Sequence, residues 1–297
     1  MFSRKWALVA LFMVQLLYGL NYTFAKTVIN DGFVGAFGFV VLRVIGACLM
    51  FWLLGLFLPK EEIDRRDYIK FIIAAVFGVF INMILFLKGL ELTSPIHASS
   101  IMTITPVIIL VLSYFILKEA ITTTKLIGVF LAFSGALVLT IYGKSVREAD
   151  NVLLGNTFIF MNAASYSVYV ILIKKLTEKY HPLTFIKWLF LFGSLMVLPF
   201  GYGDVTRIDL SSFTPYAYFS ITFVVIGATF GTYLLNPLAL SKLKASTVGA
   251  FIYLQPAIAG LFALAMGADE MDLVKLLAML IIFSGVYLVS KKPKITN

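Results

Sequence analysis

One arginine, Arg43, lies within a long apolar segment. Apolar packing does not explain a charged side chain at this position. Arg43 lies nine residues beyond Val34, where we predict that a helix begins, or about 14 Å along the axis at about 1.5 Å per residue. At that depth in a bilayer an arginine costs at least about 2.5–3.5 kcal/mol on insertion scales, so it is expected to have a function. Two interpretations stay open: Arg43 bonds carbonyl and hydroxyl groups of a neighbouring helix, or it binds a substrate carboxylate.

The positions of the acidic residues bear on that choice. All fifteen Asp and Glu residues fall in predicted loops or at predicted helix ends, so the sequence offers Arg43 no obvious buried anionic partner. A carboxylate proton relay at the membrane midplane, a common device of proton-coupled transport, is therefore not expected. The pathway is predicted to be neutral to positive, which favours zwitterionic or anionic small molecules over cationic ones as the substrate.

Uncharged polar side chains recur in several of the apolar segments, and in the first and sixth segments they share one helix face. They are Gln15, Tyr18, Asn21 and Tyr22 in the first, Asn162, Tyr166 and Tyr169 in the sixth, and Asn82, Thr103, Thr232, Asn236, Tyr253 and Gln255 elsewhere. In lipid, such side chains must face protein or water. They either bond helix to helix or line a central cavity. We predict the cavity, because aromatic rings and neutral donors suit a small polar solute.

Two prolines, Pro106 and Pro256, interrupt predicted helices at corresponding positions 150 residues apart. Proline removes a backbone hydrogen bond and leaves a carbonyl free. In transporters, interrupted helices at matching places in two halves point to the binding site. We therefore predict gating kinks at both prolines, with a plain packing kink as the alternative.

The elements that hold these residues are predicted to be ten membrane-spanning helices. The 297 residues are 61% hydrophobic and 13% charged, with a mean hydropathy of +0.98, a balance that a soluble core of this size could not bury. Runs of about 20 apolar residues are long enough to span a bilayer. They predict an all-α integral membrane protein with helices at 6–26, 34–58, 69–90, 97–117, 124–142, 152–173, 183–200, 215–240, 245–266 and 272–290.

Lysine and arginine are distributed unevenly among the connecting segments. If the N-terminus is cytoplasmic, sixteen of the 24 Lys and Arg lie in inner segments, six in outer segments and two within helices. This bias predicts cytoplasmic termini and a multi-pass protein of the cell membrane, in contact with the lipid bilayer. Because the net charge of +9 is spread over short loops rather than one basic face, no nucleic-acid partner is expected.

The sequence repeats itself with an offset of about 150 residues. Residues 133–135 match residues 283–285 as Phe-Ser-Gly, and an offset of 148 pairs Tyr18 with Tyr166. The repeats are predicted to be two five-helix domains, residues 1–147 and 148–297. Because five is odd, the second repeat must insert upside down relative to the first, an arrangement found in many transporters.

Several short motifs resemble those of a known family. They are Tyr18-Gly19-Leu20-Asn21-Tyr22, Leu42-Arg43, Thr93-Ser94-Pro95, Thr105-Pro106-Val107, Leu117-Lys118-Glu119 and Gln255-Pro256. In this order they resemble the EamA-like two-repeat branch of the drug/metabolite transporter superfamily, over nearly the whole chain, with Tyr18 where Trp is common. The resemblance implies ten helices, cytoplasmic termini and transport of small metabolites, often by export of amino acids or related compounds. It does not identify the substrate.

The sequence thus predicts a secondary transporter that works by alternating access through a central cavity between the repeats. A lipid flippase or scramblase of the same fold stays open as an alternative. An intramembrane enzyme is disfavoured, because no nucleophile, base and orienting group occur together and no catalytic residue is predicted. No cofactor and no metal site are expected either, since Cys48 is the single cysteine and both histidines stand alone.

Two further features concern packing. Small residues such as Gly128, Gly135 and Gly285 predict close contact between the fifth and tenth helices, within the bundle rather than with a second copy. The oligomeric state stays open, and a monomer is compatible with the sequence. Glu119, directly after Leu117-Lys118, is expected to serve a helix boundary on the inner side.

Overall fold

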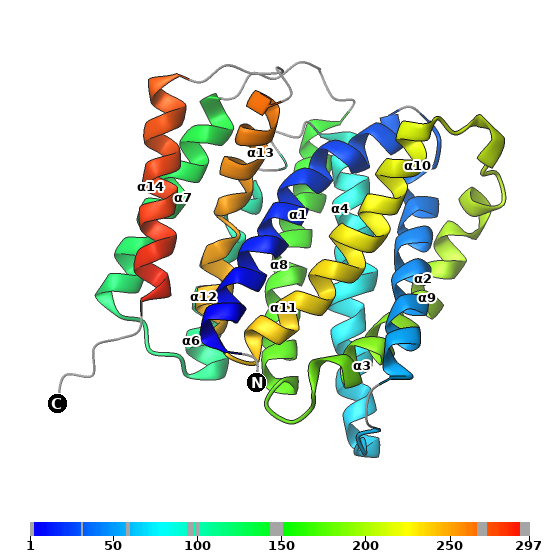
Figure 1. Cartoon of the computed structure of the whole chain (residues 1–297), viewed down its shortest axis with the longest axis horizontal. Coiled ribbons are helices and arrows are strands. Elements are labelled where there is room, and N and C mark those ends of the chain that lie inside the picture. Colours follow the sequence, from blue (N-terminus) through cyan, green and yellow to red (C-terminus); the bar gives the residue numbers. More distant parts are fainter. Residues whose placement is uncertain are drawn as a thin grey trace.

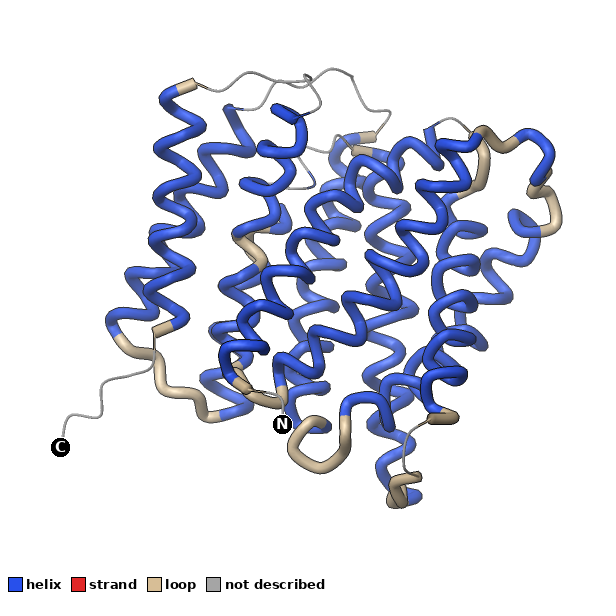
Figure 2. The backbone as a smooth tube through the Cα atoms, in the orientation of Figure 1, coloured by secondary structure: helices blue, strands red, loops and turns tan. Residues whose placement is uncertain are grey.

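The computed structural model of this chain describes residues 3–30, 32–57, 60–93, 98, 101–142, 151–265 and 272–291. Helices and the turns between them make up nearly all of this backbone, and no strand occurs within these ranges (Figure 2). The predicted all-α fold is therefore confirmed.

The first half of the chain forms helices that follow the predicted spans closely. They are α1 (Arg4–Asn30), α2 (Ala36–Gly55), the 3-10 turn η1 (Arg65–Asp67), α3 (Tyr68–Ala75), the π-helical η2 (Val76–Phe80), α4 (Ile81–Leu92), α6 (Thr105–Leu117) and α7 (Thr123–Tyr142). The segments α3, η2 and α4 follow one another without a gap and together fill the predicted span 69–90.

The second half repeats this order. Its elements are α8 (Val152–Leu176), α9 (Pro182–Val205), the 3-10 turn η3 (Leu210–Ser212), α10 (Pro215–Thr222), the π-helical η4 (Phe223–Gly231), α11 (Thr232–Leu240), α12 (Ala245–Phe251), α13 (Leu254–Ala265) and α14 (Leu273–Ser290). Local chemistry sets several starts, because the side chains of Asn151, Thr214 and Asp272 each accept a backbone N–H of the first turn that follows.

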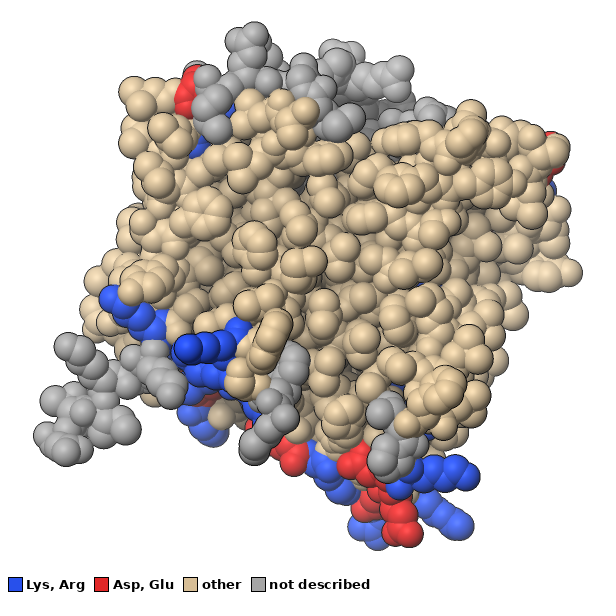
Figure 3. All heavy atoms as spheres, viewed as in Figure 1, with Lys and Arg blue, Asp and Glu red and all other residues tan. Residues whose placement is uncertain are grey.

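The outer surface is suited to lipid. Within the described ranges, eight helices are long and apolar enough to cross a bilayer, and Thr105–Leu117 and Thr123–Leu139 are shorter apolar helices. Figure 3 shows a broad uncharged belt, with Lys, Arg, Asp and Glu gathered mainly at its lower end. Since exposed charge is costly in hydrocarbon, this surface is that of a multi-pass membrane protein. The count of ten crossings stays a prediction.

The start of α1 and the end of α14 lie at the same end of the bundle (Figure 1). The guanidinium of Arg4 donates a hydrogen bond there to the carbonyl oxygen of Ser290. We call this the N-terminal end of the bundle. It also carries most of the charged side chains visible in Figure 3, in accord with the expected distribution. Its cytoplasmic orientation stays a prediction.

The two halves correspond element by element. Helices α1 and α8 begin 148 residues apart, and α7 and α14 begin 150 residues apart. The π-helical segments correspond too, because η2 moved by 150 residues falls within η4. Such π-helical turns are rare and often occur at functional sites, and hydropathy does not reveal them. The predicted domain boundary at 147/148 lies outside the described residues.

Both prolines lie directly after a break in their helix. A turn at 103–104 precedes α6, which contains Pro106, and a turn at 252–253 separates α12 from α13, which contains Pro256. Proline is well tolerated in the first turn of a helix, where its missing N–H would have no intrahelical partner. The predicted interruptions are confirmed, and their role in gating stays a prediction.

Helices α7 and α14 pack on each other through their glycines. A Cβ added to Gly285 would lie 2.5 Å from the carbonyl oxygen of Gly128 and 2.5 Å from the backbone nitrogen of Ala132. A Cβ on Gly135 would lie 2.7 Å from the carbonyl oxygen of Ala278. The predicted close packing of these helices within the bundle is therefore confirmed.

Candidate functional site

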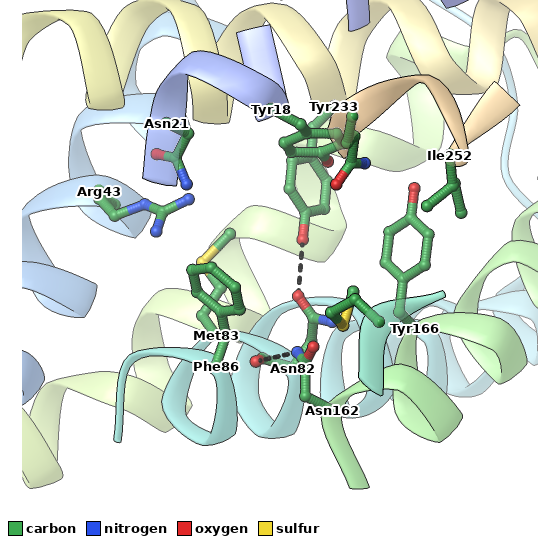
Figure 4. Close-up of a pocket in the computed structure, with 12 residues that line it drawn as sticks. Tyr18, Asn21, Arg43, Asn82, Met83, Phe86, Asn162, Tyr166, Tyr233 and Ile252 are labelled. Carbon is green, nitrogen blue, oxygen red and sulfur yellow. Dashed lines mark hydrogen bonds between the residues drawn. The ribbon is translucent and has the colours of Figure 1, made fainter. Parts of the chain in front are cut away.

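A partly open cavity lies between the helices, with side chains of both halves around it (Figure 4). From the first repeat, α1, α2, α4 and the segment before α6 contribute to its wall. From the second repeat, α8, α11 and the segment from the end of α12 to the start of α13 contribute. Both proline-linked breaks therefore adjoin the cavity.

Seven residues of the predicted cavity line it. They are Tyr18, Asn21, Arg43, Asn82, Asn162, Tyr166 and Gln255. These residues come from helices far apart in the sequence, so the polar faces predicted for the first and sixth helices do converge on one space. Figure 4 shows Arg43 and Asn21 on one side of it and Tyr166 on the other.

Six other predicted residues do not line the cavity, and several of them hold the residues that do. They are Gln15, Thr103, Tyr169, Thr232, Asn236 and Tyr253, all buried. Asn236 Nδ2 donates to the hydroxyl of Tyr166 at 2.6 Å, and Gln255 Nε2 donates to Gln15 Oε1 at 2.8 Å. The second of these bonds joins the two repeats. The side chain of Tyr22 lies outside the described part of the structure.

Five lining residues were not predicted from the sequence, four of them because they are apolar and the prediction rested on polar side chains. They are Met83, Phe86, Met102, Tyr233 and Ile252. Four of them are related by the repeat, because 150 residues separate Met83 from Tyr233 and Met102 from Ile252. With Tyr18 and Tyr166, 148 residues apart, these are matched pairs facing one cavity. The cavity therefore lies where the two repeats meet around their pseudo-twofold axis.

The Arg43 side chain is 4% exposed and reaches the cavity from α2. Its Nε donates to Thr229 Oγ1 at 3.0 Å, and its Nη1 is buried without a hydrogen-bond partner. Among the residues that the structure describes, no carboxylate forms an ion pair with it. A guanidinium with unused donor capacity thus faces the cavity, which suits an anionic group on a ligand.

Two asparagines supply acceptors to the same region. Asn162 Nδ2 donates to the backbone carbonyl of Asn82 at 2.7 Å. Because a carbonyl can only accept, this bond orients the Asn162 amide and leaves its Oδ1 as the buried atom without a partner. Asn21 Oδ1 is also buried and unpaired. The cavity therefore offers both a cationic donor and amide acceptors.

Tyr233 links the cavity to a π-helical segment. Its hydroxyl donates to the carbonyl oxygen of Gly78 within η2. The same hydroxyl lies 3.5 Å from Asn82 Oδ1, the upper dashed line in Figure 4. A backbone carbonyl in the π-helical turn of the first repeat thus accepts a hydrogen bond from a side chain of the second repeat.

At the N-terminal end of the bundle, Glu119 joins the repeats. Its carboxylate accepts the backbone N–H of Ala245 at 2.7 Å and the hydroxyl of Ser246, in the first turn of α12. Lys125 Nζ lies 3.6 Å from the same carboxylate and donates to Ser246 Oγ at 2.7 Å. Glu119 does serve a helix boundary, as expected, but that of the opposite repeat.

A second contact between the repeats lies at this end. The buried Asp67 carboxylate accepts from Lys179 Nζ and, at 2.7 Å, from the hydroxyl of Tyr180. The hydrogen bond to Asp67, and then that to Tyr180, raises the pKa of Lys179 above its ordinary value. Both contacts hold the first repeat against the second on the side where the chain begins.

Comparison with known proteins decides the family. The EamA-like transporter family matches residues 5–141 and again residues 153–291. The chain belongs to this family. It is 25% identical over 291 residues to an uncharacterized transporter of Archaeoglobus fulgidus, covering 97% of this chain and 99% of that one. It is 23% identical over 233 residues to the uncharacterized transporter YetK of Bacillus subtilis, covering 78% and 71%.

The fold is shared with a solved crystal structure. The two superpose with a TM-score of 0.76 at 16% identity, over 97% of this chain and 98% of the other. The family member described here is thus a multi-pass membrane protein with the two-repeat fold, as the motifs indicated. Among its described residues, no group of three or more His, Cys, Asp or Glu side chains could hold a metal ion.

Proposed function

We propose that this EamA-family protein is a secondary transporter that exports a small zwitterionic or anionic metabolite, such as an amino acid or a related compound. Transport would proceed by alternating access through the cavity between the repeats. The observation that carries the proposal is Arg43, whose buried guanidinium faces the cavity with a free donor and no described carboxylate partner. The direction of export is what the resemblance to the family implies.

The cavity is complementary to a zwitterion. A ligand carboxylate would neutralise Arg43, and a ligand ammonium or hydroxyl group would donate to the unpaired oxygens of Asn21 and Asn162. A purely cationic solute would meet a positive group with no carboxylate to offset it. The same positive charge that attracts the carboxylate of a zwitterion therefore disfavours a cation.

The positions of the helix breaks support alternating access. Met102, next to the first break, and Ile252, within the second, both line the cavity. Rotation at the two breaks would move the cavity wall from both repeats together. In the state open toward the N-terminal end, the contact of Glu119 with α12 would have to separate, because it joins the repeats there.

The proposal is tested by the composition of the growth medium. Cells would express the wild type, Arg43→Ala or an empty vector, and extracellular metabolites would be compared by untargeted mass spectrometry. Arg65→Ala is the matched control, because Arg65 is an exposed arginine at the same end as the termini. Membrane insertion of each variant would be checked on isolated membranes.

We expect one class of amino acid or carboxylate to accumulate with the wild type and with Arg65→Ala, and not with Arg43→Ala. No change in the medium despite inserted protein would refute export under those conditions. Fluorescent phospholipid translocation in proteoliposomes would then be measured. Translocation by the wild type in that assay would favour the lipid flippase alternative over solute transport.

A further inference from the structure

We propose that Thr229 is a positioning residue: it holds Nε of Arg43, so that the terminal nitrogens Nη1 and Nη2 meet the carboxylate of the solute end-on. The inference rests on the proposed function, because it assigns a mode of binding to the same cavity. Thr229 does not itself line the cavity; its action on the ligand is through Arg43.

The hydroxyl of Thr229 is committed as an acceptor. It is fully buried in η4, and its one proton is donated to the carbonyl oxygen of Val224 at 2.7 Å. A hydroxyl has one donor and two acceptor lone pairs. The lone pairs are therefore left for Arg43 Nε, which approaches to 3.0 Å.

The π-helical segment is part of this arrangement. In an α-helix, a threonine hydroxyl reaches the carbonyl three or four residues earlier. Here the acceptor, Val224, is five residues earlier, the spacing of a π-helical turn. The wide turn thus supplies the proton acceptor that leaves the oxygen of Thr229 free toward α2. Such π-helical turns are often found at functional sites. In η4 the turn would serve the site by orienting the hydroxyl of Thr229.

The opposite half of the molecule shows that packing does not require the polar pair. With the 150-residue offset, Arg43 corresponds to Gly193 and Thr229 corresponds to Val79. These two residues also meet, because a Cβ on Gly193 would lie 2.5 Å from a γ carbon of Val79. The fold makes the same helix contact twice, once from apolar groups and once from a guanidinium and a hydroxyl. Since the fold can make this helix contact from apolar residues, we attribute the Arg43–Thr229 pair to ligand binding.

The geometry of the guanidinium decides how a ligand can bind. Its five N–H groups form a planar fork, with one edge that includes Nε and one edge made by the two terminal nitrogens. Thr229 occupies Nε, so a carboxylate cannot use that side edge. The buried and unpaired Nη1 lies on the end edge. Figure 4 shows the guanidinium directed from α2 into the space beside Asn21.

The first arm of the test needs no ligand. The purified protein would be labelled with ¹⁵N-arginine, and exchange of each Nε–H with water would be followed by NMR. The chain has six arginines, and the signal that is lost in Arg43→Lys identifies Arg43. We expect exchange at Arg43 to be at least about tenfold faster in Thr229→Val, which keeps the shape but lacks the acceptor, since a charge-assisted bond is lost.

Two further variants complete this arm. Thr229→Ser retains the hydroxyl and should restore slow exchange. Thr157→Val is the matched control, because the Thr157 hydroxyl donates only to a carbonyl of its own helix. The double variant Arg43→Met with Thr229→Val imitates the apolar contact of the opposite repeat. It should fold and insert as the wild type does, which separates a binding role from a folding role.

The second arm measures binding. Thermal unfolding of the same proteins would be measured at increasing concentrations of an equimolar mixture of the twenty standard amino acids. A parallel series would use the corresponding amines, which lack the carboxylate. We expect the amino acids alone to stabilise the wild type. In Thr229→Val the half-saturating concentration should rise about tenfold at unchanged maximal stabilisation, and Thr229→Ser and Thr157→Val should bind as the wild type does.

The outcomes separate the two claims. Wild-type exchange and wild-type half-saturation in Thr229→Val would overturn the positioning role, even if Arg43→Lys abolished binding. Failure of the amino acids to stabilise the wild type, or equal stabilisation by the amines, would overturn the proposed class of solute. The exchange measurement would still decide whether Thr229 holds Nε.

Discussion

Replacement of Glu119 by glutamine is expected to weaken the junction between the repeats at the N-terminal end. Glu119 and Lys125 are 9% and 6% exposed, so neither charge is well solvated by water. The glutamine keeps the shape and one oxygen for the N–H of Ala245, but Lys125 loses its opposite charge. The expected loss of stability therefore comes from the buried Lys125 ammonium, which no longer has an opposite charge beside it, and not from a cavity.

The magnitude follows from the contacts. Removal of one partner of a buried ion pair costs about 3–5 kcal/mol, and the N–H of Ala245 can still be satisfied. We therefore expect Glu119→Gln to cost about 3 kcal/mol, at the lower end of that range. Lys125→Met should cost less, because Glu119 keeps its bonds from Ala245 and Ser246. The double variant should recover about 1–3 kcal/mol relative to the sum of the single changes.

The assay is reversible unfolding in mixed micelles, followed by the fluorescence of the three tryptophans. Glu62→Gln is the control, because Glu62 is an exposed acid at the same end. Strictly additive single and double variants would refute the coupling between Glu119 and Lys125. A cost for Glu119→Gln no larger than that of the control would show that the carboxylate does not hold α12.

Three further results are expected. Gly285→Ala should lower the unfolding free energy by about 1–3 kcal/mol through overpacking on Gly128, without change of oligomeric state in light scattering, because α7 covers this face. Tyr233→Phe, which removes the donor to a carbonyl in η2, should cost about 1 kcal/mol in the same assay, and a cost near zero would argue against that bond. The pKa of Lys179 is raised by its bond to Asp67, so its contribution is complete below about pH 10 and is lost as pH rises through the folded pKa. The stability difference between wild type and Lys179→Met should thus be constant from about pH 6 to 9 and shrink above about pH 10.5, whereas a difference that shrinks toward acid would contradict this sign.

The helices could be predicted from the sequence because, in lipid, each helix depends mainly on the residues of its own segment. Each apolar run must satisfy its own backbone, so its length and composition are enough to place a helix. The predicted span 215–240 coincides with α10, η4 and α11 taken together. The π-helical turn inside it could not be predicted, because apolar composition and length do not distinguish a π-helical turn from the α-helix around it.

The candidate site was predictable in part. Polar residues at helical spacing, such as Tyr18 and Asn21, point to a face, and the structure places that face on the cavity. The same reasoning placed Tyr253 and Asn236 on the cavity, whereas they lie buried behind its wall. Whether a polar side chain faces a cavity or a neighbouring helix depends on the rotation of the helix against partners distant in the chain.

The sequence by itself determined the all-α class, the apolar segments, the two repeats and the absence of a mid-helix carboxylate, because these are properties of composition and short-range order. Only the tertiary structure decided which groups meet. Arg43 and Thr229 are 186 residues apart, and Glu119 and Ala245 are 126 residues apart. No local pattern pairs residues across such distances. They meet because two repeats of opposite orientation pack around one axis, and that packing converts an expensive buried arginine into a group with one bond made and one edge free.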